Sequence, residues 1–311
     1  MDPALTALAL AALLAPADPA PAGPAAASPS TVTSAAEIHA PPAEDGVVRV
    51  QLLPRQDRWL PGRRQLVGVH FEMEEGWHLY WPGLNDSGLP IELTPRGPEG
   101  VTFGEVAWPA PSRYLSPGEL VDHVYHDEVT LLLPVTLPAE PPADGGRLRI
   151  EVGADWLVCE EACVRGGVTV ELSMTLAADG QAGEGPGAGP IAATQARLPG
   201  PAPEALAVGW ADAAGDDAVE RGLRLTVPGA ARLAFYPAAT SLYVVDVYSN
   251  GEAEGDTLEL VVDLTPPYAP PDEEPPPPRV AGVLEIWREG AEASELARID
   301  LAPPGEGPRG G

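Results

Sequence analysis

Apolar and polar residues alternate along much of the first half of the chain, which is the pattern of half-buried β-strands. The clearest example is QLVGVHFEM, from Gln65 to Met73, and an earlier alternation includes Val50 and Leu52. Further strand-like segments, each bounded by turn residues, are residues 101–108, 129–137, 148–158 and 168–176. Short strands at this spacing, with no helical period between them, predict a β-sandwich.

The second half repeats the pattern after a change in composition. Residues 177–203 are dominated by Gly, Ala and Pro, which predicts a flexible linker with room for a short helix near residues 191–197. Asn250-Gly251 predicts a hairpin turn, and the Pro-rich run 266–278 predicts an extended, exposed loop. The strand-like segments here are 222–227, 231–236, 242–248, 257–264, 279–288 and 296–301. A second sandwich is therefore expected.

The N-terminus resembles an export signal. Leu5 to Leu14, LTALALAALL, is an apolar run of signal-peptide length that is too short to span a bilayer. The region before it carries Asp2 and no basic residue, which departs from an ordinary signal peptide. No other segment approaches the ~20 apolar residues of a transmembrane helix. We therefore expect a periplasmic or secreted protein with no membrane span in the mature chain.

The charge of the chain is strongly negative. Eighteen basic residues, all of them Arg, stand against 46 acidic ones, which gives a net charge of −28. A field of this sign repels phosphate backbones and anionic lipid. Nucleic-acid binding is therefore not expected.

Cys159 and Cys163 are the two cysteines of the chain, and they lie within the segment WLVCEEACVRGG. Two thiols this close in an exported chain tend to form a disulfide. Such a short ring stabilises a fold by only about 2 kcal/mol on the chain-entropy model. The spacing alone leaves a structural staple and an exchangeable redox pair about equally open. Glu160 and Glu161 lie between the sulfurs and disfavour a strongly acidic thiol.

Other polar and aromatic residues support weaker hypotheses. His123, His126 and Asp127 could place metal ligands near one another, and with two thiolates they would suit copper(I). His70 and His78 fit structural roles better than catalysis, and His126 fits an exposed turn. For the aromatic group Trp77, Tyr80 and Trp81, core packing is a better explanation than sugar stacking. We predict no bound cofactor and no metal site.

Four segments resemble the N-terminal periplasmic region of the DsbD/ScsB family of thiol-disulfide interchange proteins. They are GWHLYW with NDSGLP (residues 76–81 and 85–90), VAWPAP (106–111), YHDEV with LPV (125–129 and 133–135), and WLVCEEAC (156–163). They occur in the family's order over residues 46–176. The resemblance implies an immunoglobulin-like sandwich that presents Cys159 and Cys163 as a redox pair. It also implies a capping loop that shields the sulfurs, expected near residues 115–123.

The resemblance further implies partners. The pair would take electrons from a separate membrane electron-transfer protein and pass them to thioredoxin-like periplasmic proteins. Two departures bear on this expectation: the best-known members of the family space their cysteines more widely, and neither a transmembrane electron-transfer domain nor a thioredoxin domain follows. A protein-interaction module with a static disulfide and a copper-binding protein therefore remain as alternatives.

Together these observations predict an all-β chain of two immunoglobulin-like β-sandwich domains joined by a Gly/Ala/Pro-rich linker. The expected divisions are a signal-like segment and disordered lead-in (1–45), the sandwich with the cysteine pair (46–177), the linker (178–203), the second sandwich (204–302) and a disordered tail (303–311).

Overall fold

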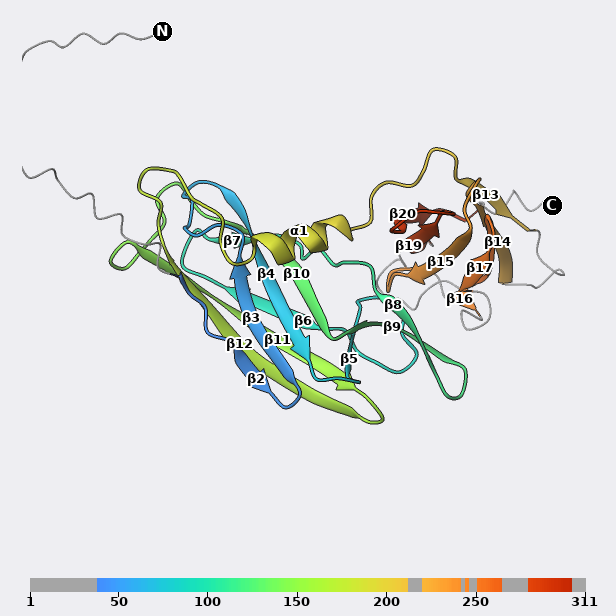
Figure 1. The fold of residues 1–311 in the computed structure, drawn as a ribbon, viewed down its shortest axis with the longest axis horizontal. Helices are drawn as coiled ribbons and strands as arrows, with labels where there is room; N and C mark the ends of the chain where they lie inside the picture. The colour runs from blue at the N-terminus through green and yellow to red at the C-terminus, as the bar shows by residue number, and fades with distance from the viewer. Residues whose placement is uncertain (1–37, 212–219, 242–243, 246–250, 265–278, 304–311) are drawn as a thin grey trace, which may run out of the picture. The chain divides into compact units, whose positions relative to one another are not determined.

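A computed structural model describes residues 38–211, 220–241, 244–245, 251–264 and 279–303. The signal-like segment, the predicted turn residue Asn250 and the Pro-rich run lie outside the described residues. The described part of the chain is built almost wholly of antiparallel strands arranged in four sheets (Figure 1). None of its helices is long and apolar enough to cross a membrane.

Two of the sheets form the first sandwich. The larger sheet has the order β1 (Ile38–His39), β12 (Cys163–Thr175), β11 (Arg147–Cys159), β5 (His78–Tyr80), β9 (Leu120–His126) and β8 (Ser112–Ser116), and β6 (Glu92–Arg96) pairs with β11. The facing sheet has the order β2 (Ala43–Asp45), β3 (Val48–Pro54), β4 (Arg64–Met73), β10 (Glu128–Thr136) and β7 (Thr102–Phe103).

Side-chain alternation explains why these two sheets pack together. Along β11, Leu148, Ile150, Val152, Ala154 and Trp156 are all buried, while the residues between them are more exposed. Successive side chains of a strand point to opposite faces, so these five form the inner face of the larger sheet. They share one core with the apolar face of β3, β4 and β10.

The second sandwich follows the same principle. One sheet contains β13 (Ala207–Trp210), β14 (Glu220–Thr226), β18 (Thr257–Asp263) and β16 (Val244–Val245), and the other contains β17 (Glu252–Glu254), β15 (Arg232–Pro237), β19 (Val280–Trp287) and β20 (Glu295–Leu301). Leu225, Leu260, Phe235 and Leu284 come from both sheets and are fully buried in one core. The all-β prediction is thus confirmed, whereas the domain boundaries stay a prediction.

Residues 178–203 differ from the flexible linker that their composition predicted. They contain α1 (Ala188–Ala196), and Ile191 of this helix is fully buried. The Thr194 hydroxyl donates to the Thr130 carbonyl of β10 at 3.1 Å. Upstream, the amides of Gly185 and Gly187 donate to carbonyls of residues 54 and 55. Close backbone approach, which glycine permits, ties this segment to the first sandwich.

One predicted strand is much shorter than expected. Residues 101–108 contribute only the two residues of β7, followed by an isolated bridge between Ala107 and Leu132. The backbone of Gly104 pairs instead with the carbonyl of Pro134, and Pro109 follows. Gly and Pro interrupt the ladder here, as they do in strands generally.

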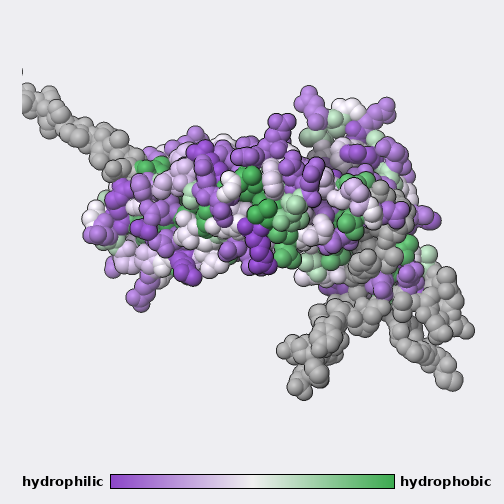
Figure 2. All heavy atoms as spheres, turned by 90° about the horizontal axis from the view of Figure 1, so that it is seen from below, coloured by the Kyte–Doolittle hydropathy of each residue, from purple (hydrophilic) through white to green (hydrophobic). Residues whose placement is uncertain are grey.

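Hydrophilic side chains dominate the described part of one face of the molecule. The face drawn in Figure 2 is mostly hydrophilic, with apolar areas between hydrophilic residues. Five large apolar side chains are markedly exposed among the described residues: Leu89, Leu115, Leu120, Val164 and Val208. Val164 is the neighbour of Cys163, which draws attention to that end of the sheet.

Candidate functional site

The two cysteines lie directly opposite each other at the end of the β11–β12 hairpin. Cys159 is the last residue of β11 and Cys163 is the first residue of β12. They are register partners, they are joined by a disulfide, and their Cα atoms lie 4.2 Å apart. This separation is close to the ~4.5 Å of a pair that exchanges no backbone hydrogen bonds across an antiparallel ladder. The three residues between the cysteines, Glu160, Glu161 and Ala162, therefore form the turn of the hairpin.

The two half-cystines differ greatly in exposure. Cys159 is only 3% exposed, whereas Cys163 is exposed. Cys159 lies between two strands, because β5 pairs with the other edge of β11 at this residue. A large reagent can therefore reach the disulfide only from the side of Cys163.

A row of side chains crosses the sheet from the disulfide. Cys159 is opposite His78 of β5, and His78 is opposite His126 of β9. Directly opposite residues in neighbouring strands share a face, so the cysteines and both imidazoles lie on the outer face of the larger sheet. His78 is 2% exposed, and His126 is exposed at the end of its strand. The ring centroids of the two histidines are 5.7 Å apart.

Two tyrosines complete this outer-face cluster. The hydroxyl of Tyr80 lies 3.9 Å from Sγ of Cys163 and 3.2 Å from Nε2 of His78. Its ring is buried and packs with Val124 and Cys159. Tyr114, from β8, lies against His78 with ring centroids 4.6 Å apart. We name Cys159, Cys163, His78, Tyr80 and Tyr114 the disulfide cluster.

The loop that contains Ser87 and Gly88 is hydrogen-bonded to the buried carboxylate of Asp122 and supports Tyr80. The carboxylate of Asp122, 1% exposed, accepts hydrogen bonds from Ser87 Oγ at 2.5 Å and Ser87 N at 3.0 Å. The next residue, Gly88, lies so close to the Tyr80 ring that a Cβ there would be 1.9 Å from Cε1. The NDSG segment thus serves as a brace for the tyrosine.

Burial keeps both polar rings next to the disulfide uncharged at neutral pH. Desolvation, with a smaller contribution from nearby His126, lowers the pKa of His78 to about 4, although Asp122 opposes the shift. Desolvation also raises the pKa of Tyr80, while its hydrogen bond with Ser87 opposes that change. Near pH 7 the cluster therefore offers a phenol hydroxyl and a neutral imidazole beside the sulfurs.

The residues weighed as an alternative metal site, His123, His126 and Asp127, do not come together. The ring of His123 points to the opposite side of its strand, where it contacts Trp81 and Tyr236. The ring of His126 faces His78 and Tyr114, and Asp127 occupies the following turn with φ +59°. Adjacent strand residues alternate between faces, so His123 and His126 cannot share a ligand set. No group of three or more metal-binding side chains is found among the described residues.

The sequence predicted structural roles for His78 and core packing for Tyr80 and Trp81, and all three side chains are buried. It did not predict that His78 and Tyr80 lie in the disulfide cluster. Tyr114 was not singled out at all. The two-residue spacing of His78 and Tyr80 is a signal for a shared strand face, but their closeness to the cysteines depends on strand pairing. Residues 115–123 form the turn end of the β8–β9 hairpin, and their role as a cap stays a prediction.

Comparisons with known proteins agree with this geometry. Residues 49–174 match the family model described as "Thiol:disulfide interchange protein DsbD, N-terminal". The crystal structure of the N-terminal periplasmic domain of ScsB from Proteus mirabilis is similar in fold, with 14% sequence identity, a TM-score of 0.52, and coverage of 84% of this chain and 95% of that one. The sporulation control protein Spo0M from Bacillus subtilis aligns with a TM-score of only 0.22, at 11% identity over 83% of this chain and 91% of that one. No curated protein matches the chain.

Proposed function

We propose that this protein exchanges disulfides with partner proteins through Cys159 and Cys163, because residues 49–174 match the family model of the DsbD N-terminal region. The family and the disulfide fit thiol-disulfide interchange in general. The observation that carries the specific proposal is the unequal exposure of the two sulfurs at the hairpin end, with a phenol hydroxyl beside the exposed one.

The exposure gives the two cysteines separate roles. A partner thiolate attacks Sγ of Cys163, forms an intermolecular disulfide with it, and releases Cys159 as the leaving thiolate, which takes up a proton. The second thiol of the partner then attacks its own sulfur in the mixed disulfide and releases Cys163. The partner dithiol is thereby oxidised by two electrons and the Cys159–Cys163 pair is reduced. The reverse sequence passes the electrons to a second partner.

Tyr80 would assist at the exposed sulfur. Its hydroxyl lies within long hydrogen-bond distance of Cys163 Sγ, and its raised pKa keeps it protonated. A protonated phenol can donate to the Cys163 thiolate each time this sulfur is released. His78 accepts or donates at the other side of the same hydroxyl, at 3.2 Å, and thereby orients it.

The compartment and the partners follow from the same proposal. The signal-like N-terminus and the relationship to a periplasmic domain support a periplasmic location. The partners would be thioredoxin-like proteins and a separate membrane electron-transfer protein. Acidic residues next to Cys163 would favour partners with a basic rim.

Trapping by serine variants tests the proposal. Cys159→Ser leaves the exposed thiol without its resolving partner, so it should accumulate a mixed disulfide with a thioredoxin-like protein, visible on a non-reducing gel. Cys163→Ser is the matched control and should trap little, because the remaining thiol is buried. If neither variant traps a partner, or if Cys163→Ser traps more, the proposed roles are wrong.

The reduction potential separates exchange from a static disulfide. A potential above about −250 mV, measured against glutathione buffers, lies in the range of periplasmic exchange proteins. A value below about −300 mV is typical of structural disulfides, and it would favour an interaction module instead.

A further inference from the structure

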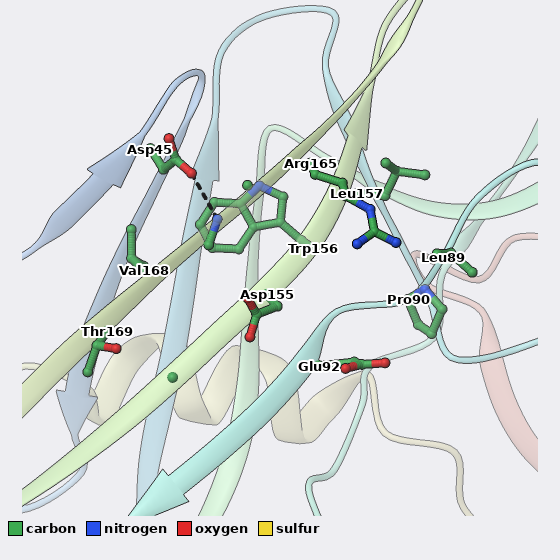
Figure 3. Close-up of a pocket in the computed structure, with 13 residues that line it drawn as sticks. Asp45, Leu89, Pro90, Glu92, Asp155, Trp156, Leu157, Arg165, Val168 and Thr169 are labelled. Atoms are coloured by element: carbon green, nitrogen blue, oxygen red, sulfur yellow. Dashed lines mark hydrogen bonds between the residues drawn. The ribbon is translucent and has the colours of Figure 1, made fainter.

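One edge of the larger sheet is open beside Cys163. The end strand β12 pairs with β1 only at Ser173 and Met174. Further along the same edge, the Gly167 amide donates to the Asp45 carboxylate at 2.9 Å, shown by the dashed line in Figure 3. In the described part of the chain, no strand pairs with this edge between Cys163 and Gly166.

The direction of the backbone groups on this edge follows from the Asp45 contact. Since the Gly167 amide points away from β11, every second residue of the strand does the same. The amides and carbonyls of Cys163 and Arg165 therefore point outward. Among the described residues, β1 and Asp45 contact this edge as far as Gly167, and no strand pairs with Cys163 or Arg165.

An open pocket of about 610 Å³ lies alongside this stretch. Figure 3 shows Leu157 and Arg165 near Leu89 and Pro90, with Trp156 behind the strand. Gly166 and Gly167 also line the pocket, and neither position has room for a side chain. A Cβ on Gly166 would lie 2.5 Å from the Trp156 indole nitrogen, and one on Gly167 would lie 2.7 Å from an Asp155 carboxylate oxygen.

The charge of the pocket indicates which kind of chain fits it. Three carboxylates line it, from Asp45, Glu92 and Asp155, against the single guanidinium of Arg165. An approaching segment with Lys or Arg is therefore favoured. A second copy of this chain is disfavoured, since its net charge is −28.

We propose that the exchange partner adds an extended segment to the Cys163–Arg165 edge of β12, and that this segment places a basic side chain in the adjacent pocket. This inference rests on the proposed function and names how the partner is bound. Backbone pairing of an added strand supplies affinity, and the pocket supplies selectivity. Because the edge includes the backbone of Cys163, pairing would bring the partner's sulfur to the only exposed half of the disulfide.

A proline substitution on the edge tests the proposal. Arg165→Pro removes the outward amide, and an edge strand tolerates proline where that amide faces solvent. Arg165→Ala removes the same side chain and keeps the amide. Each variant is assayed for the rate of reduction by thioredoxin and by dithiothreitol.

We expect Arg165→Pro to slow reduction by thioredoxin about tenfold relative to Arg165→Ala, because the two variants lack the same side chain and differ in the amide. Reduction by dithiothreitol should be the same in both, which also shows that the hairpin is intact. An equal thioredoxin rate for Arg165→Ala and Arg165→Pro would overturn the inference alone. A wild-type protein that dithiothreitol reduces and thioredoxin does not would overturn the proposed function itself. If the wild type forms a dimer that Arg165→Pro abolishes, the edge binds a second copy and the proposal is wrong.

A second measurement does not depend on the folding of the proline variant. In the mixed disulfide of Cys159→Ser with thioredoxin, the Arg165 amide should exchange with deuterium at least tenfold more slowly than in the free variant. The same rate in both states would contradict strand addition.

Discussion

Acidification should destabilise this protein through a buried histidine beside the site. His123 is 1% exposed, and its Nδ1 donates to the Leu84 carbonyl at 2.7 Å. Its Nε2 is buried without a hydrogen-bond partner among the described residues. A proton added at Nε2 would therefore create a buried charge beside the rings of Trp81 and Tyr236. Desolvation lowers the pKa of His123 to about 4, against the opposing effects of the Leu84 hydrogen bond and Asp122.

The sign and size of the effect follow from proton linkage. Below pH 6.5 the imidazole of His123 is protonated in the unfolded state, whereas in the native state it stays neutral until the pH approaches its lowered pKa of about 4. The contribution of His123 to the free energy of unfolding is thus fully present above pH 6.5 and is lost as the pH falls toward 4. Between pH 7 and pH 5 the loss at His123 is roughly 2 kcal/mol. His78, whose pKa is also lowered to about 4, contributes in the same direction.

Urea unfolding at pH 7, 6 and 5 measures this loss. His123→Phe keeps a buried ring and removes the titrating group, so its stability should fall less steeply with acid than that of the wild type. If His123→Phe and the wild type lose the same stability between pH 7 and pH 5, the reasoning on the buried imidazole is refuted.

Three further predictions concern the disulfide cluster and the packed helix. Tyr80→Phe removes the hydroxyl that lies 3.9 Å from Cys163 Sγ, so in the reduced protein the Cys163 pKa should rise, measured by the pH dependence of alkylation; an unchanged pKa would contradict the Tyr80 role. Gly88→Ala should displace the Tyr80 ring, which would change the near-UV circular dichroism and slow exchange with thioredoxin, whereas Gly189→Ala, at an exposed position of α1 with open space for a Cβ, should leave both signals unchanged. Ile191→Ala should destabilise the fold by roughly 3 kcal/mol in urea unfolding, whereas a loss below 0.5 kcal/mol would mean that α1 is not packed as described.

The long strands were predictable because each has one buried face and one exposed face. Gln65 to Met73 was expected as a strand and forms most of β4, and residues 148–158 account for nearly all of β11. Two-fold alternation is a local property of the sequence, so it can be interpreted without any knowledge of the strand's neighbours.

β9 was not predicted as a strand, because its five central residues are buried on both faces. Its sequence, LVDHVYH, places Asp122 and His123 side by side, and each is 1% exposed. The NDSG loop covers Asp122, and Tyr236 of the second sandwich contacts His123. A strand whose polar residues are satisfied by distant segments does not show alternation.

The cysteine pair was identified correctly as a bonded pair, but its surroundings were not. His78 is 81 residues from Cys159 in sequence, and only the register of β5 against β11 makes them neighbours. Pairing between strands that are far apart in sequence depends on the whole fold, which explains why the sequence did not place Tyr80 beside the disulfide.

The position of the disulfide at the end of a long ladder has a thermodynamic consequence. Each strand of the β11–β12 hairpin has 13 residues, and the covalent link joins only the final pair. Breaking that link restores to the unfolded chain the entropy of a very small ring, about 2 kcal/mol. The remaining cross-strand pairs hold the hairpin closed in either oxidation state. If the pair cycles as proposed, its reduction and reoxidation should therefore be only weakly coupled to folding, with no passage through an unfolded state.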